Sequence, residues 1–388
     1  MSEFLLNEVC ELIVDCPHTT AKDEGEGFPL VRTPNIGKGR LVYDGMHRVC
    51  EDVYNKRNAR AIPQENDLIF ACEATAGNVA LIQKGEKVCL GQRTVLIRPN
   101  QEIVNPAFLT YFLLAPKQQY NLLSTANGAT VAHVNLPTIR NLKIDLPELS
   151  TQHRIATILS RYDSLIENYQ KQIKLLEEAA QRLYKEWFVN LHFPGHENTK
   201  IVDGVPEGWE KKKLVDLVDV QYGYAFDGKL FNSNREGMPI LRIRNIPEGL
   251  TSDYTTEEAS NDYIVHNGDI VVGMDGIFHI NSWSGDDAYL VQRACSFRPK
   301  EECMKGFIFQ AIQEPIKFFE KTLVGATVAH LGKKHIDSIE LCVPKNFELY
   351  QPFSKFYNQR QGLLSQIRLL TEARDRLLPK LMSGEIAV

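Results

Sequence analysis

The same six residues, Gly-Ala-Thr-Val-Ala-His, occur twice in this chain, at 128–133 and again at 325–330. Other short segments recur in the same order: Pro29-Leu-Val-Arg32 with Pro239-Ile-Leu-Arg242, Asn35-Ile36 with Asn245-Ile246, Asp67-Leu-Ile with Asp269-Ile-Val, Gln92-Arg93 with Gln292-Arg293, and Arg98-Pro99 with Arg298-Pro299. Each copy takes up about half of the 388 residues, whereas solenoid repeats run roughly 20–50 residues. The sequence therefore predicts a duplicated module, and with it two similar sites in one chain.

The composition is that of an ordinary globular protein, with 43% hydrophobic and 24% charged residues. The sequence shows neither a signal peptide nor an apolar run of about 18 residues, so we expect a cytoplasmic protein without a membrane span. The eight cysteines show no zinc-binding spacing and are expected to be reduced thiols. A net charge of −5 argues against nucleic acid, although a local basic face can still bind phosphate.

Residues 1–150 and 209–346 are each predicted to form an α/β (α+β) domain, joined through a linker at 193–208. Short apolar runs such as 67–71 and 94–97 read as strands between Gly, Pro and Asn turns. One helix is expected at 106–120, with Pro106 in its first turn.

Two long helices are predicted, at 151–192 and 347–388. Apolar residues in the first recur at alternating spacings of four and three, the a/d seam of a coiled coil, and Arg360 and Arg374 interrupt the same pattern in the second. Pro379 is expected to kink or fray the second helix near its end. The simplest partner for one seam is the other, which predicts an intramolecular antiparallel coiled coil and approximate two-fold symmetry. The seam residues are Ile155, Leu159, Ile166, Ile173, Leu176 and Leu183, with Ile367, Leu370 and Leu377.

In both halves the repeated Gly-Ala-Thr turn precedes an apolar strand ending in Pro, at 142–147 and 339–344. A glutamine follows, Gln152 or Gln351, and then the long helix. Val205-Pro-Glu-Gly-Trp209 opens the second module. This ordered set, present twice, resembles the specificity (S) subunit of type I restriction-modification systems over essentially the whole chain. The second helix departs from the first in being shorter between its glutamine and Ile367.

The resemblance implies that each globular domain is a target recognition domain, reading one half of a split, asymmetric sequence in double-stranded DNA. It implies that the helices set the spacer and dock two methyltransferase subunits, with two restriction-translocase subunits in systems that have them. S-adenosylmethionine, ATP and Mg would then belong to the partner subunits. The chain also offers surface for a partner along the charged flank of the helices, at 191–196 and at Phe188.

Catalytic motifs are missing from the sequence. Asn105-Pro106-Ala107-Phe108 lacks the second proline of a DNA amino-methyltransferase loop, and Gly37-Lys-Gly-Arg does not fit a P-loop. His133 and His330 end the repeated hexapeptides and are expected to serve structure or phosphate contact. We therefore expect a DNA-binding chain that is not itself an enzyme.

Arginine and lysine read guanine, and asparagine and glutamine read adenine. Residues that recur in both modules cannot distinguish two half-sites, so they are expected to serve structure or phosphate positioning, while residues that differ should discriminate. The recurring candidates are Arg32, Asn35, Gln92 and Arg93 with Arg242, Asn245, Gln292 and Arg293, and the differing candidates are Lys38, Arg40, Thr75 and Asn78 against Arg244, His279, Asn281 and Trp283.

Another class of function stays open at this point. Two globular domains on a coiled coil also suit a structural adaptor that binds proteins. DNA binding weakens steeply with salt, which separates the two hypotheses. A stand-alone enzyme is a third possibility, and the missing motifs count against it.

Overall fold

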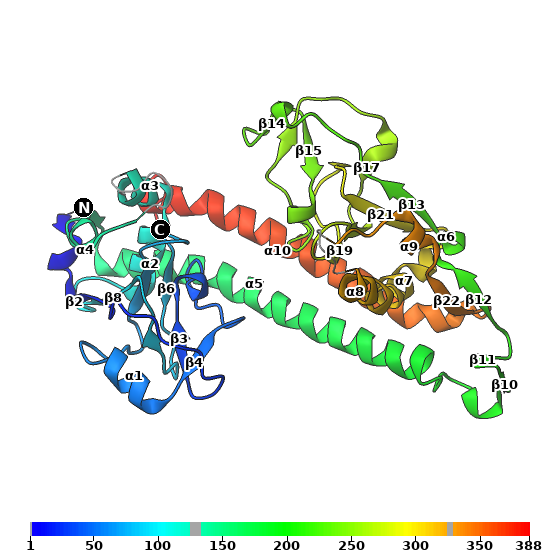
Figure 1. The fold of residues 1–388 in the computed structure, drawn as a ribbon. Coiled ribbons are helices and arrows are strands. Elements are labelled where there is room, and N and C mark those ends of the chain that lie inside the picture. Colours follow the sequence, from blue (N-terminus) through cyan, green and yellow to red (C-terminus); the bar gives the residue numbers. More distant parts are fainter. Residues whose placement is uncertain (1, 125–132, 324–328) are drawn as a thin grey trace. The chain divides into compact units, whose positions relative to one another are not determined.

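The computed structural model describes residues 2–124, 133–323 and 329–388. The chain divides into two compact units, Met1–Ile166 with Leu370–Val388, and Glu167–Leu369. The division passes through both long helices, so each unit contains one α/β module and part of each helix (Figure 1). The domain limits expected from the sequence, which separate modules from helices, stay a prediction.

In the first unit, a four-stranded antiparallel sheet has the order β2-β8-β5-β6, and a smaller sheet has the order β4-β3-β7, with β3 and β7 parallel. The strands β1 and β9 pair separately. The bounds are β1 (Ser2–Leu5), β2 (Cys10–Asp15), β3 (Phe28–Val31), β4 (His47–Val49), α1 (Glu51–Arg57), β5 (Leu68–Ala71), β6 (Val79–Leu81), β7 (Cys89–Leu90), β8 (Thr94–Pro99), α2 (Pro106–Leu114), α3 (Pro116–Ser124), α4 (Leu136–Arg140) and β9 (Lys143–Leu146).

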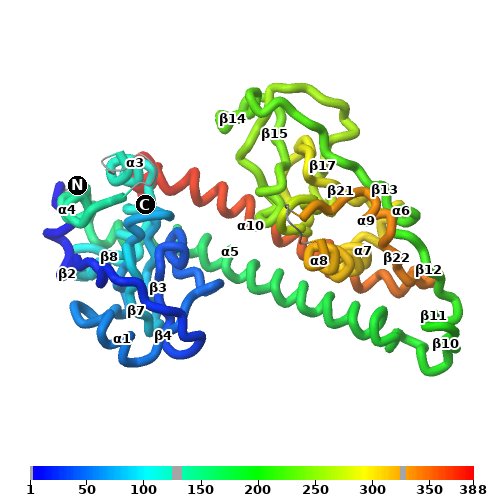
Figure 2. Tube along the Cα trace, viewed as in Figure 1, coloured from blue at the N-terminus to red at the C-terminus, as the bar shows by residue number. Residues whose placement is uncertain are grey.

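The second unit repeats the arrangement of the main sheet, whereas its second sheet is larger, with the order β14-β16-β15-β20-β17. The path of this part of the chain can be followed in Figure 2. Its four-stranded sheet has the order β13-β21-β18-β19, β15 lies parallel to β20, and β12 pairs with β22. The predicted duplication is therefore confirmed in the fold. The bounds are β10 (Ile201–Val202), β11 (Val205–Pro206), β12 (Trp209–Lys213), α6 (Leu214–Leu217), β13 (Val218–Tyr222), β14 (Phe231–Asn232), β15 (Met238–Leu241), β16 (Tyr254–Thr255), β17 (Ile264–Val265), β18 (Ile270–Gly273), β19 (Ile280–Ser282), β20 (Ala288–Leu290), β21 (Ala294–Pro299), α7 (Lys305–Ala311), α8 (Gln313–Thr322), α9 (Lys333–Asp337) and β22 (Glu340–Pro344).

One inner strand of each main sheet, β5 or β18, has no polar side chain, and both of its faces are buried. Successive side chains of a strand point to opposite faces. Leu68 and Phe70 of β5 join the core that contains the helices, whereas Ile69 and Ala71 join the core under the smaller sheet. In β18, Ile270 and Val271 divide in the same way.

A repeated ion pair explains one of the sequence repeats. Arg98 donates from Nε and Nη2 to the carboxylate of Asp67, at 2.8 and 2.7 Å, and Asp67 is 2% exposed. Arg298 makes the corresponding pair with Asp269, with Nε 3.1 Å from Oδ2. Each pair joins adjacent strands of the main sheet, so the repeated residues maintain the framework of the module.

The two long helices of the predicted fold are confirmed, as α5 (Leu149–Tyr184) and α10 (Gln351–Ser383). A π-helical turn, Lys185–Val189, continues α5. The helices run antiparallel, because the start of α5 meets the end of α10 in the first unit. There Ile155 and Leu159 share a core with Leu378 and Leu381.

In the second unit the end of α5 meets the start of α10, where Phe188 packs against Phe353. Pro379 does not end α10, which continues to Ser383.

Burial along the helices differs from a simple coiled-coil seam. The seam residues Ile155, Leu159, Ile166 and Ile173 are buried. Leu176, Leu183, Ile367, Leu370 and Leu377 are only partly buried. In α10 the most buried positions are instead Phe353, Tyr357, Arg360, Leu378 and Leu381. The reason is that Phe353, Tyr357, Leu378 and Leu381 pack into the cores of the modules.

Two other local expectations are corrected. The helix expected at 106–120 is two helices, because Pro116 has no N–H to donate and starts a new helix. Phe188 does not lie on an outer surface: it is 9% exposed and packs against Trp209 and Phe307. Phe188 therefore belongs to the core of the second unit. No helix in the described ranges is both long and apolar enough to cross a membrane.

We predict that Arg98→Ala lowers the free energy of unfolding by about 3 kcal/mol, because it leaves the buried Asp67 carboxylate without its charged partner. The control is Arg182→Ala, which removes an exposed pair with Glu178 and should change the free energy by less than about 0.5 kcal/mol. Calorimetry on the two variants measures both effects. Equal losses in the two variants would contradict the assigned role of the pair.

Candidate nucleic-acid interface

The loop after β3, residues 32–46, contains the first group of candidates and is named loop A. A 3-10 turn, Thr33–Asn35, starts it. The Asn35 side chain accepts from the backbone N–H of Arg32 at 3.2 Å and donates to the carbonyl of Val42 at 3.1 Å. Asn35 is 1% exposed. Because its amide is buried and used to close loop A, we no longer count it among the DNA contacts.

Loop A is anchored on the hairpin β5-β6. The backbone of Gly39 pairs with β6, donating to Val79 at 2.7 Å and accepting from Leu81 at 3.1 Å. The Asn78 amide donates to the Ile36 carbonyl at 2.9 Å, and the Thr75 hydroxyl donates to the Thr33 carbonyl at 2.7 Å. Thr75 and Asn78 therefore position loop A, which is a structural use for two residues that we expected to read bases.

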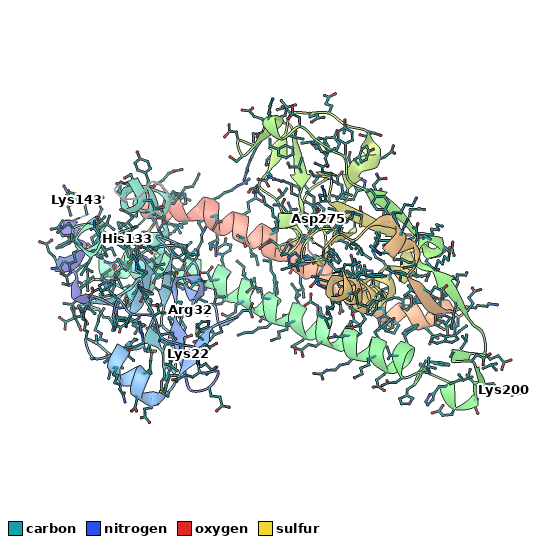
Figure 3. The ribbon with its side chains drawn as sticks, in the orientation of Figure 1. Lys22, Arg32, His133, Lys143, Lys200 and Asp275 are labelled. Carbon is teal, nitrogen blue, oxygen red and sulfur yellow. The ribbon has the colours of Figure 1, made fainter. Side chains whose placement is uncertain are left out.

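Three basic side chains remain on loop A. Lys38 is exposed, and Arg40 is partly buried. Arg32, which is labelled in Figure 3, donates to the carbonyl of Gly45 at 2.9 Å. Lys38 and Arg40 have no counterpart in the repeated segments, so they remain candidates for base reading in the first module.

The corresponding loop of the second module, residues 242–253, is named loop B. Asn245 accepts from the Arg242 N–H at 2.9 Å, which repeats the cap made by Asn35. The guanidinium of Arg242 lies over the ring of Phe231, 5.2 Å from its centroid. The Arg244 side chain is 59% exposed and forms a bidentate pair with Asp253, with contacts of 2.6 to 3.1 Å. Arg244 therefore projects a charge from loop B in a defined direction.

The other differing candidates of the second module lie on or beside β19. The Asn281 amide donates to the carbonyls of Ile246 and Pro247, at 2.9 and 2.8 Å, so it holds loop B and is not free to pair with a base. His279 is partly buried just before β19. We retain His279 and withdraw Asn281 as a base-reading candidate. Trp283 is also withdrawn, because it is 0% exposed and belongs to a core cluster.

A second set of repeated residues forms a cluster in each module. Arg93 and Arg293 both have left-handed backbones, with φ of 64° and 73°. Arg93 pairs with Glu73, and the Nδ1 of His133 lies 3.0 Å from the same carboxylate.

In the second module, Asp275 lies 2.7 Å from Arg293 Nη1 and 2.5 Å from His330 Nδ1 (Figure 3). The two clusters join the end of each repeated hexapeptide to the main sheet. Of the two hexapeptides, residues 128–132 and 325–328 lie outside the described residues.

The described ranges contain no cluster of three or more His, Cys, Asp or Glu residues that could hold a metal ion. Burial raises the pKa of the Cys72 thiol to about 12 and that of the Cys89 thiol to about 11. These thiols stay protonated near neutral pH and are poor nucleophiles.

Sequence reasoning missed two arginines in α10, Arg360 and Arg374. Arg374 Nη1 lies 2.7 Å from Asp163 of α5, which also accepts from the Tyr111 hydroxyl at 2.5 Å. Burial works to lower the pKa of Arg374, but its hydrogen bonds to Asp163 and Asp375 raise the pKa overall. The interruption of an apolar seam by arginine was the signal that could have found both residues, because a charge at a seam position needs a partner.

Comparison with known proteins identifies the family of this chain. A family model described as a type I restriction modification DNA specificity domain matches residues 1–178 and again residues 206–367. The chain belongs to this family. The two matches correspond to the two modules, which are therefore the target recognition domains of a DNA-binding specificity subunit.

Individual relatives align with nearly the whole chain. The MjaIX specificity subunit, from a type I restriction enzyme of Methanocaldococcus jannaschii, is 25% identical and aligns with 96% of this chain and 90% of its own length. The MjaVIII subunit of the same organism is 28% identical over 96% of this chain and 89% of its own length. The crystal structure of a type I S subunit from M. genitalium shares the fold, with a TM-score of 0.57 at 16% identity, covering 98% of this chain and 95% of that one.

Arg244 and Arg293 should respond differently to substitution by alanine. We predict that Arg244→Ala relaxes specificity at one base, because loop B differs in sequence from loop A. The binding free energy on the target sequence should become less favourable by about 1–3 kcal/mol. Arg293→Ala should weaken binding about equally on target and unrelated DNA, as expected for phosphate contact. Fluorescence anisotropy on both duplexes at one salt concentration measures the two ratios. If Arg293→Ala alters base preference instead, its assignment is wrong.

Proposed function

We propose that each target recognition domain reads one half of a split, asymmetric sequence in double-stranded DNA. The observation that carries this proposal is that loops A and B share a frame but present different side chains. Asn35 and Asn245 close the two loops in the same way, whereas loop A carries Lys38 and Arg40 after its asparagine and loop B carries Arg244 immediately before its own. A common frame with different exposed groups suits two half-sites of different sequence.

The long helices would set the distance between the half-sites and dock two methyltransferase subunits. In support, Leu175 of α5 is 65% exposed and Leu369 of α10 is 57% exposed, although both lie on long helices that carry apolar seams. A groove of about 490 Å³ lies between the helices in the second unit. It is lined by Gln172, Leu175, Leu176, Gln359, Gly362, Leu363 and Gln366. Three leucines line this groove, Leu175, Leu176 and Leu363, and such a contiguous apolar lining favours a protein partner.

In this proposal the chain directs chemistry but performs none. S-adenosylmethionine would be bound by the methyltransferase subunits, and ATP and Mg²⁺ by restriction-translocase subunits where these are present. The same exposed leucines would also serve a protein-binding adaptor, which is the second candidate function. The two candidates differ in whether loops A and B contact phosphate.

Salt dependence tests DNA recognition against the adaptor. For the chain in complex with its methyltransferase subunits, we predict that affinity for target DNA falls by at least about 10-fold between 50 and 200 mM salt, because phosphate contacts release counterions. Binding to the methyltransferase subunits themselves should change much less. Affinity for DNA that stays constant with salt, or is undetectable at 50 mM, would favour the adaptor.

Lengthening α5 tests the spacer. Four residues, about one helical turn, are inserted between Ile166 and Leu176, and we predict a longer undefined gap between two unchanged half-sites. The control places the same four residues in the exposed turn at Asp203 and Gly204, between β10 and β11, where the gap should stay as in the wild type. The gap is read by sequencing methylated DNA. An unchanged gap in a folded α5 variant would overturn the spacer role.

A further inference from the structure

Arg360 of α10 connects several parts of the second unit. Its side chain is 8% exposed, and all three guanidinium nitrogens donate hydrogen bonds. Nε donates to Glu177 of α5 at 2.6 Å, Nη1 to the Ser282 hydroxyl, and Nη2 to Oδ1 of Asn281 at 2.8 Å. The guanidinium also lies 5.4 Å from the ring centroid of Phe309. One buried cation thus joins both long helices to strand β19.

The contact with Asn281 determines how loop B is held. An asparagine amide can be placed in two orientations that exchange its oxygen and nitrogen. Arg360 can only donate, and the backbone N–H of Ser282 donates to the same Oδ1 at 2.8 Å, so both require the Asn281 oxygen on their side and leave Nδ2 facing loop B. There Nδ2 donates to Ile246 and Pro247. Arg360 is therefore the side chain that, together with the Ser282 N–H, orients the amide that holds the loop.

Loop B lies tightly on this site. Ser284 donates from its backbone and its hydroxyl to the Gly249 carbonyl, both at 2.9 Å. A Cβ added to Gly249 would lie 2.8 Å from the Ser282 carbonyl oxygen. A small change in the Asn281 side chain would therefore shift the loop that carries Arg244.

The first module holds its loop differently. The register of each hairpin places Ala80 opposite Ile69 and Asn281 opposite Val271, so Ala80 is the counterpart of Asn281. Ala80 has no polar side chain, and loop A pairs with β6 through the backbone of Gly39. Asn78 supplies the amide that reaches the Ile36 carbonyl. Only loop B, of the two, relies on an amide that a helix arginine orients.

We propose that Arg360 is a positioning residue for DNA reading by the second target recognition domain, acting through Asn281 on loop B. This inference rests on the proposed function. It assigns a role to an arginine that, in the sequence, only interrupts an apolar seam. Because Arg360 and Glu177 lie on the two long helices, the same contacts tie loop B to α10 and α5.

The test is half-site discrimination by Arg360→Lys. Lysine keeps the charge but lacks the planar fork that donates in three directions. The variant is co-expressed with the methyltransferase subunits, and methylation is compared on the wild-type target and on targets with one base changed in either half. We expect discrimination to fall about 10-fold or more in one half and to stay as in the wild type in the other.

Two matched variants show which half of the DNA target each module reads. Asn281→Asp keeps the acceptor for Arg360 and removes the donor to loop B, and Asn78→Asp removes the donor to loop A. They should impair opposite halves, and Arg360→Lys must impair the half affected by Asn281→Asp. The double variant Arg360→Lys with Asn281→Asp should lose no more discrimination than Asn281→Asp alone, since both act on one path.

Several outcomes would overturn the inference. One is that Arg360→Lys loses discrimination equally in both halves of the target, or only in the half affected by Asn78→Asp. The others are that Arg360→Lys discriminates as well as the wild type, or that the losses in the double variant are additive. Failure of the proposed function looks different, because the wild-type complex itself would then show no split target. Arg376→Lys serves as a further control: Arg376 lies on the same helix in an exposed pair with Glu372, away from loop B, so the discrimination of this variant should match the wild type.

Discussion

Burial of the helix ends in the module cores is the constraint on which the rest of this structure depends. The core of the first unit takes in Ile155 and Leu159 from the start of α5 and Leu381 from the end of α10. The core of the second takes in Phe353 from the start of α10 and Phe188 from the end of α5. Neither module closes its core without both helices. The helices are therefore structural parts of each recognition domain rather than tethers attached to it.

This arrangement leaves other parts of the helices for other uses. Between the positions that pack into the modules, α5 and α10 present exposed leucines and glutamines around an open groove. A protein that needed only to hold two domains apart would gain nothing from such leucines, because exposed apolar side chains lower solubility. Their presence is consistent with subunits that bind the helices from outside.

The two modules also illustrate how a duplicated frame can carry two different loops. Buried repeats such as Asp67 with Arg98, and Asp269 with Arg298, keep the sheets alike. The loops above them differ in charge and in how they are anchored. The Asn78 amide holds loop A and the Asn281 amide holds loop B, and the Asn281 oxygen also accepts from Arg360, so the second loop has an anchor that substitution on α10 can retune. Divergence of the half-sites would then require few changes outside the loops.

Much of the fold could be predicted because its signals are local or repeated. The hexapeptide repeat revealed the duplication, and the four-three spacing of apolar residues revealed the long helices. The candidate site was harder, because a sequence does not show whether a polar side chain faces solvent or a backbone carbonyl. Thr75, Asn78 and Asn281 suited base reading by residue type, yet each is engaged with a loop backbone.

Sequencing the methylated sites in DNA from cells that express this chain with its methyltransferase subunits tests the central claim most directly. The account predicts one motif made of two short, different half-sites separated by an undefined gap of fixed length. A contiguous palindrome, or no methylation by an assembled complex, would contradict the claim that the two modules read the two halves of one target.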